Sequence, residues 1–118
     1  MGPGVKERFM AASNISPSEF KTALQQQVVI KKCLETILSH QRVVIIPTAA
    51  NLPPLLNSSP AEFDRFRGDS FRLLCIAGLA GLPQINLPLI KIDGVPFGVS
   101  IIGAAHTDIE LLQLASSL

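Results

Sequence analysis

The sequence predicts an α/β fold with about three strands and about four helices. Two observations lead to this prediction. Residues 43–46 and 85–90 are short apolar runs, which is typical of strands that pack within a covered sheet. Elsewhere apolar residues recur at helical spacing, and three of these segments open with Ser or Thr followed three residues later by Glu. That spacing is the pattern of a capping box, in which side chain and backbone satisfy each other at a helix start.

The first half of the chain begins with a Gly2-Pro3-Gly4 turn and a short amphipathic helix over residues 5–12. Ser16-Pro17-Ser18-Glu19 then predicts the start of a long helix, with proline at its first position. This helix is expected to run to about Ser39, where His40 can interact with the helix dipole. Its apolar stripe consists of Phe20, Ala23, Ile30, Leu34 and Ile37.

The middle of the chain contains one strand and one helix. Residues 43–46 form an unbroken β-branched run that Pro47 ends, so we expect a strand covered on both faces. Residues 48–58 are a loop rich in proline and asparagine. Ser59-Pro60-Ala61-Glu62 repeats the capping box and predicts a helix that ends at Gly78. Its apolar stripe consists of Phe63, Phe66, Leu73, Leu74 and Ala77.

The last third predicts a hairpin and a final helix. Residues 85–90 form one strand, Asp93-Gly94 turns the chain, and residues 97–102 return as a second strand. Thr107 and Glu110 form the third capping box, which predicts a helix through residues 111–115.

Composition excludes several classes of protein. The formal net charge is +1 with no run of Lys or Arg, so nothing indicates a nucleic-acid partner. The apolar stretch 73–82 is too short to span a membrane, and no signal or targeting segment is visible, so we expect an intracellular protein, cytoplasmic or plastid-associated.

The cysteines and histidines do not predict a metal site. Cys33 and Cys75 lie among apolar residues and are expected to be buried thiols, with a disulfide or a reactive thiol as alternatives. His106 is expected on a solvent-facing loop. We predict no metal and no cofactor, because neither histidine has a cysteine or carboxylate at ligand spacing.

A family resemblance rests on motifs in a fixed order. They are Gly81-Leu82-Pro83, then Pro88, then Asp93-Gly94-Val95-Pro96-Phe97-Gly98, with residues 43–48 before and 103–108 after. This pattern resembles the C-terminal part of the amidase signature family, from about Gly4 to the end. The resemblance implies that residues 1–118 are a partial amidase-like domain, the C-terminal segment only. It implies the corresponding piece of the fold, about three strands of a mixed sheet packed by about four helices.

The chain departs from the commoner family pattern at two positions. Gly78 replaces a frequent asparagine, as in plant-type members such as indole-3-acetamide hydrolases, and Ile90 replaces a frequent glycine.

The resemblance also implies what is missing. Complete members hydrolyse a carboxylic amide through an acyl-serine, using a Ser–cis-Ser–Lys triad that lies upstream of this region. No glycine- and serine-rich stretch of that kind occurs here, so we assign no catalytic residue and predict a chain inactive alone. In such enzymes the segment after the first strand lies near the acyl pocket, so Thr48, Ala49 and Ala50 become candidates for a substrate-binding rim. The alternative for these three residues is a strand-ending loop.

Two other functions stay open. One is a non-catalytic amidase-like binding or scaffold module, as in a chloroplast-envelope import receptor. The other is an autonomous small α/β domain that self-associates through its open sheet edges, since unpaired edge strands invite pairing with another chain. A small-molecule amide is an expected partner only of the complete domain.

Overall fold

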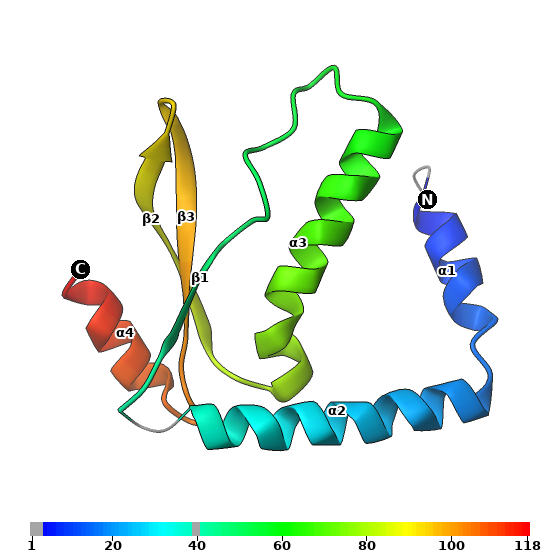
Figure 1. The fold of residues 1–118 in the computed structure, drawn as a ribbon, viewed down its shortest axis with the longest axis horizontal. Coiled ribbons are helices and arrows are strands. Elements are labelled where there is room, and N and C mark those ends of the chain that lie inside the picture. The colour runs from blue at the N-terminus through cyan, green and yellow to red at the C-terminus, as the bar shows by residue number, and fades with distance from the viewer. Residues whose placement is uncertain (1–3, 39–40) are drawn as a thin grey trace.

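The computed structural model describes residues 4–38 and 41–118, and within them it contains four helices and three strands (Figure 1). The elements in chain order are α1 (Val5–Ser13), α2 (Pro17–Ile37), β1 (Val44–Pro47), α3 (Pro60–Ala80), β2 (Gln84–Ile92), β3 (Val95–Ile102) and α4 (Asp108–Ser116). This order and the α/β class confirm the predictions. The expected Gly2-Pro3 turn, the helix end at Ser39 and the role of His40 lie outside the described residues.

The three strands form one sheet in the order β1-β3-β2. Both pairings are antiparallel, with Val44 and Gln84 flanking Ile102. The three strands confirm the predicted piece of the fold, and among the described residues neither pairing is parallel. The short turn between β2 and β3 accounts for their pairing, because a two-residue connection can join antiparallel strands only.

The hairpin turn confirms the prediction from Asp93-Gly94. Both residues have positive φ, 51° and 81°, as a type I′ turn requires. Further down the hairpin the register shifts between Leu87 and Ile90. Pro88 lies in this interval and has no N–H to donate, so the shift falls where the ladder would lose a hydrogen bond.

Two of the three predicted capping boxes form. The Ser16 amide donates to a Glu19 carboxylate oxygen at 2.9 Å, and the Glu19 amide donates to Ser16 Oγ at 3.2 Å. The same reciprocal pair joins Ser59 and Glu62, at 2.6 and 3.3 Å. These bonds satisfy amides that the first turn of a helix otherwise leaves unpaired.

Both capping carboxylates predict a pH-dependent helix start. The Ser16 hydroxyl, and next its amide, hold the pKa of Glu19 below its ordinary 4.5, and the Ser59 amide and hydroxyl do the same for Glu62. A lowered pKa stabilises the folded state above the ordinary pKa, and this stability is lost as pH falls through the lowered pKa. Helicity measured by circular dichroism should therefore fall below about pH 4.5, and less so in the Glu19→Gln/Glu62→Gln variant. Glu35→Gln, away from the cap, is the control. An equal response of all three proteins would contradict the prediction.

One predicted helix boundary and one predicted cap were wrong. Gly78 does not end α3, which continues to Ala80 and stops at Gly81, whose φ of 67° is the left-handed cap. Thr107 makes no side-chain cap with Glu110, because its hydroxyl donates to the Ala104 carbonyl at 2.8 Å.

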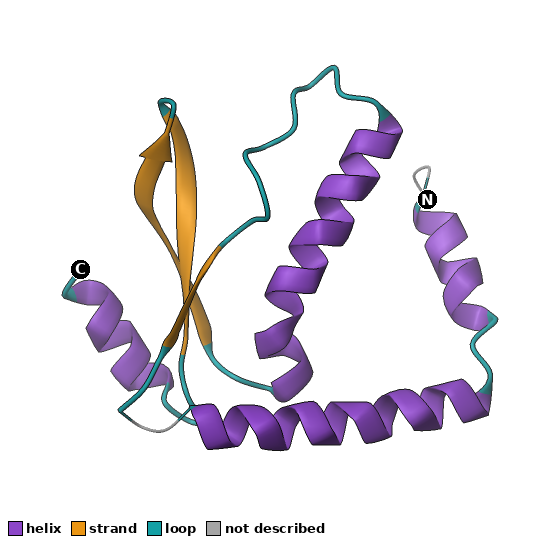
Figure 2. Ribbon diagram, viewed as in Figure 1, coloured by secondary structure: helices purple, strands orange, loops and turns teal. Residues whose placement is uncertain are grey.

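The core lies around the central strand β3. Residues 100–102 are fully buried or nearly so. Since side chains alternate across a sheet, Ile102 faces one side, where it clusters with Leu38 and Ala77, and Ile101 faces the other. Figure 2 shows α3 and α4 on opposite sides of the strands. The lower half of α3 therefore covers one face and α4 covers part of the other.

Large parts of the chain remain uncovered. The accessible surface is 8823 Å² and the radius of gyration 17.0 Å. A compact monomer of this size has about 6,200 Å² and about 13.5 Å. Ile45 in β1 is 63% exposed, so β1 is covered on one face and not on both as expected.

The two thiols are also more open than the sequence indicated. Cys33 is exposed and Cys75 is half-buried, and both are free. Nothing in the described part of the chain packs over the side of α2 that carries Cys33, which corrects the expectation of a buried thiol. Among residues 4–38 and 41–118, no helix combines the length and apolar composition needed to cross a membrane.

Candidate functional site

The end of β1 is fastened to the other two strands by Thr48. The Thr48 amide donates to the Gly98 carbonyl at 2.9 Å. The Thr48 hydroxyl donates to Asn86 Oδ1 and lies 3.2 Å from Ser100 Oγ. Ser100 is fully buried, so these polar groups satisfy one another on the face of the sheet that carries Ile102. We call Thr48, Asn86 and Ser100 the polar cluster.

Gly98 makes room for the polar cluster. A Cβ at this position would lie 2.6 Å from both Thr48 Oγ1 and Asn86 Oδ1, and 3.0 Å from Thr48 Cβ. Real Cβ atoms essentially never approach so closely. The close approach of Thr48 to β3 therefore requires glycine at residue 98.

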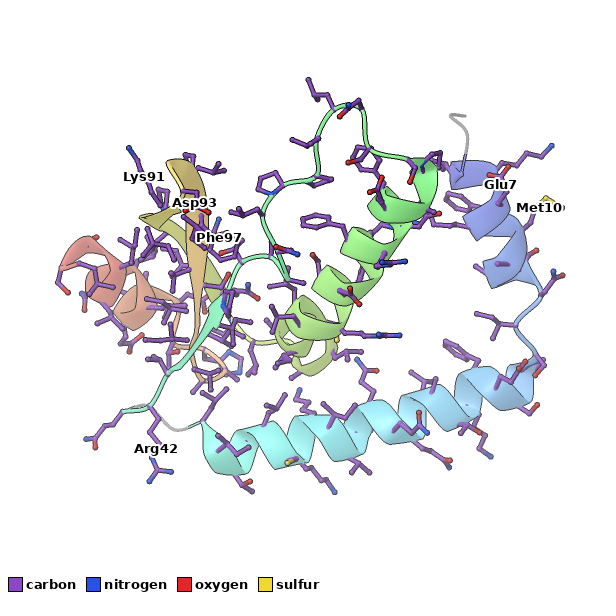
Figure 3. All side chains as sticks on the ribbon, turned by 45° about the horizontal axis from the view of Figure 1, so that its top comes forward. Glu7, Met10, Arg42, Lys91, Asp93 and Phe97 are labelled. Atoms are coloured by element: carbon purple, nitrogen blue, oxygen red, sulfur yellow. The ribbon has the colours of Figure 1, made fainter. Side chains whose placement is uncertain are left out.

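A hollow of about 240 Å³ opens beside the polar cluster. It lies between the loop after β1, the outer half of the hairpin and α3, which leans away from the sheet here (Figure 1). Figure 3 shows Phe97 on the hairpin side of this space. Its walls are mainly apolar or aromatic, and its polar groups are one hydroxyl and two side-chain amides. The lining residues include Thr48, Ala49, Asn51, Phe66, Asn86 and Phe97.

The three predicted rim residues do not share one hollow. Thr48 and Ala49 line the hollow just described, whereas Ala50 lines a neighbouring one of about 380 Å³ that contains charged side chains. The Ala50 amide also bonds to Ser70 Oγ on α3 at 3.3 Å, which ties the loop to that helix. That Thr48, Ala49 and Ala50 bind a substrate stays a prediction.

Phe66 connects these hollows to a third, apolar one. It lines both spaces above and also a groove of about 550 Å³ along α3, whose other walls include Phe71, Leu74 and Leu79. Sequence reasoning placed Phe66 on an apolar helix stripe and missed its position at the junction. A small polar residue inside an apolar strand, as at Asn86, was the available signal for the polar cluster.

The site has polar groups that can bind a ligand. Hydroxyls and amides can donate to or accept from a carbonyl or amide group. In the portion of the chain that the structure describes, no hydrogen bond joins a lysine to a serine, the pairing that would activate a serine nucleophile. His106, exposed on its loop as predicted, has a φ of 65° and belongs to another part of the molecule.

Comparison with known proteins gives the family. No model of a protein family matches the chain. Amidase 1 of Arabidopsis thaliana is 33% identical over 117 residues, which are 99% of this chain and 28% of that protein. The chain is related to the C-terminal part of the amidase signature family.

Two further comparisons agree. A solved amidase has the same fold over 98% of this chain and 27% of its own, with a TM-score of 0.76 at 21% identity. The pea (Pisum sativum) protein Translocon at the outer membrane of chloroplasts 64 is 25% identical over 98% of this chain and 20% of its own length. The chain thus spans less than a third of the length of these amidase relatives.

Proposed function

We propose that this chain is the C-terminal segment of an amidase signature protein, residues 1–118 being a partial amidase-like domain. It contributes wall and rim to a substrate pocket and lacks the catalytic serines and lysine. The observation that carries the proposal is that nearly the whole chain aligns with 28% of Amidase 1. The uncovered surface supports it, because a segment of a larger fold leaves open the faces that the rest would cover.

The reaction of the complete protein would be hydrolysis of a small carboxylic amide through an acyl-serine. In this assignment Thr48 holds the loop against the sheet, and Ala49 leaves space between Phe66 and Phe97 for the acyl group. The apolar walls and few polar groups of the hollow support this, since small-molecule sites have this composition. Ala50, in the neighbouring hollow, belongs to the outer rim.

A second candidate is a non-catalytic amidase-like scaffold. The match to the pea translocon protein over 98% of this chain favours it. The same match is the basis for proposing an intracellular location, cytoplasmic or plastid-associated. Either location agrees with the two free thiols, because reducing compartments keep cysteines unpaired.

The test compares the isolated chain with a chimera in which this chain replaces the aligned segment of Arabidopsis Amidase 1. Each is assayed with a small aryl amide that Amidase 1 hydrolyses. Light scattering and thermal unfolding first determine the oligomeric state and the stability of the isolated chain. We expect no turnover by the isolated chain and turnover by the chimera. Turnover by the isolated chain would refute the proposal. A folded but inactive chimera would favour the scaffold.

The same assay tests the pocket assignment. Ala49→Leu in the chimera should fill the hollow and lower kcat/KM at least about tenfold, equivalent to about 1.4 kcal/mol. Ala61→Leu, in the exposed first turn of α3, is the matched control and should leave kcat/KM unchanged. Equal effects of the two substitutions on kcat/KM would show that Ala49 does not line the substrate pocket.

A further inference from the structure

The two side-chain amides of the hollow beside the polar cluster belong to Asn51 and Asn86. Asn86 lies on β2 and Asn51 on the loop after β1, so the amides come from two different parts of the chain. Among the described residues that line this hollow, none is charged. A ligand group therefore meets few polar partners here, and what each of them offers determines which group fits.

The oxygen of the Asn86 amide is already bound within the protein. Thr48 Oγ1 donates to Asn86 Oδ1, and this oxygen lies against β3, because a Cβ at Gly98 would be 2.6 Å from it. Asn86 Nδ2, on the other arm of the same amide, makes no hydrogen bond with any residue in the described ranges 4–38 and 41–118. The polar cluster thus fixes which end of this amide is left for a ligand. It is the end with two N–H donors.

Asn51 is used in the same way. The backbone amide of Leu52 donates to Asn51 Oδ1 at 2.9 Å, whereas Asn51 Nδ2 has no hydrogen-bond partner in the described part of the chain. Both amides of the hollow therefore have an occupied oxygen and unpaired N–H groups. The hollow offers donors to a ligand and no free amide oxygen.

Donors in an apolar hollow select for hydrogen-bond acceptors. A ligand that displaces water leaves an N–H group unpaired unless the ligand brings an acceptor, and an unpaired group costs free energy. A carbonyl oxygen has two lone pairs, so it can accept from both amides. A carboxylate fits less well, because a charge taken out of water needs a counter-charge, and no described Lys or Arg lines this hollow. The chemistry favours an uncharged carbonyl oxygen.

We propose that Asn86, together with Asn51, makes the site selective for amides whose acyl part carries a second, uncharged carbonyl group. The first carbonyl is the one that is hydrolysed, and the second enters the hollow and accepts from the side-chain N–H groups. Thr48 is a positioning residue, because its hydroxyl holds the Asn86 oxygen against β3. The inference rests on the proposed function and adds the substrate class.

Two aryl amides of matched size test the selection in the chimera. One carries an acetyl group on its ring, and the other carries an isopropyl group at the same position. We expect kcat/KM to be at least about tenfold higher for the acetyl amide, since only this substrate pairs the N–H groups. Asn86→Leu, which keeps the size of the side chain, should lower this ratio at least about tenfold. Thr48→Val should lower it by a smaller factor.

A matched control and a second variant separate selection from stability. Asn57→Leu, at an exposed asparagine further along the loop that carries Asn51, should leave the ratio unchanged. Asn86→Asp keeps the oxygen that Thr48 binds but has no N–H group, so it should lower the ratio as Asn86→Leu does. A loss of stability alone would lower kcat/KM for both amides equally.

The outcomes separate this inference from the proposed function. An active chimera with equal kcat/KM for the two amides, or with a ratio that both Asn86 variants leave unchanged, would overturn selection by Asn86 and leave the amidase proposal intact. Titration calorimetry gives the dissociation constants of the same two amides if the folded chimera is inactive. A tenfold preference for the acetyl amide that Asn86→Leu abolishes would then support selection and count against catalysis alone. An inactive chimera without this preference, or one that cannot fold, would overturn both.

Discussion

Replacing Ile102 with alanine is expected to lower the free energy of unfolding of the chimera by about 2–5 kcal/mol. Ile102 is fully buried on the central strand and packs with Leu38 of the α2 end and Ala77 of α3. Removing three carbons here deletes apolar contact and leaves a cavity, because strands on both sides prevent collapse. Urea unfolding followed by circular dichroism measures the change.

A graded substitution controls for the position. Ile102→Val removes one carbon and should cost only about 0.5–1.5 kcal/mol. If alanine costs no more than valine, Ile102 is not at a tightly packed core position in the folded protein.

Gly98→Ala is expected to destabilise the chimera by about 1–3 kcal/mol and to disturb the hollow. The new methyl group would lie 2.6 Å from two oxygen atoms of the polar cluster, so Thr48 and the loop after it must move. Both the free energy of unfolding and kcat/KM for the aryl amide should fall.

Gly68→Ala provides the opposite control. Nothing lies within 4 Å of a Cβ at Gly68, which is inside α3, so alanine should stabilise by up to about 1 kcal/mol. In a double-mutant cycle, Thr48→Ala should restore part of the stability that Gly98→Ala removes, because Thr48→Ala deletes the hydroxyl that the new methyl group would contact. Full additivity of the two substitutions would show that residue 98 does not act through Thr48.

Local sequence signals predicted the elements well where a single chemical feature determines the start of a helix or the position of a turn. Proline at the first helical position with Ser and Glu around it determined the starts of α2 and α3, and Asp93-Gly94 determined the hairpin turn. The signals failed where two features compete. Gly78 and Gly81 can each end a helix, and Thr107 can cap a helix or bond to a nearby carbonyl.

The candidate site was less accessible to sequence reasoning. Thr48 was found through the family resemblance, but its partners Asn86 and Ser100 lie far along the chain on two other strands. Which residues meet there depends on strand order and register, and the register shifts near Pro88. Phe66 joins the site because α3 diverges from the sheet, which its helical stripe could not reveal.

The strand order has a consequence for how the chain folds during synthesis. β2 and β3 are neighbours in sequence, and hairpins of this kind close in about 1–10 μs. β1 is made before both, yet its register partner for Val44 is Ile102, about sixty positions later. At about 5–20 residues per second, the ribosome needs about 3–12 s to supply that partner. During this time the apolar β1 segment has no partner strand, so it is exposed to non-native contacts until synthesis is nearly complete.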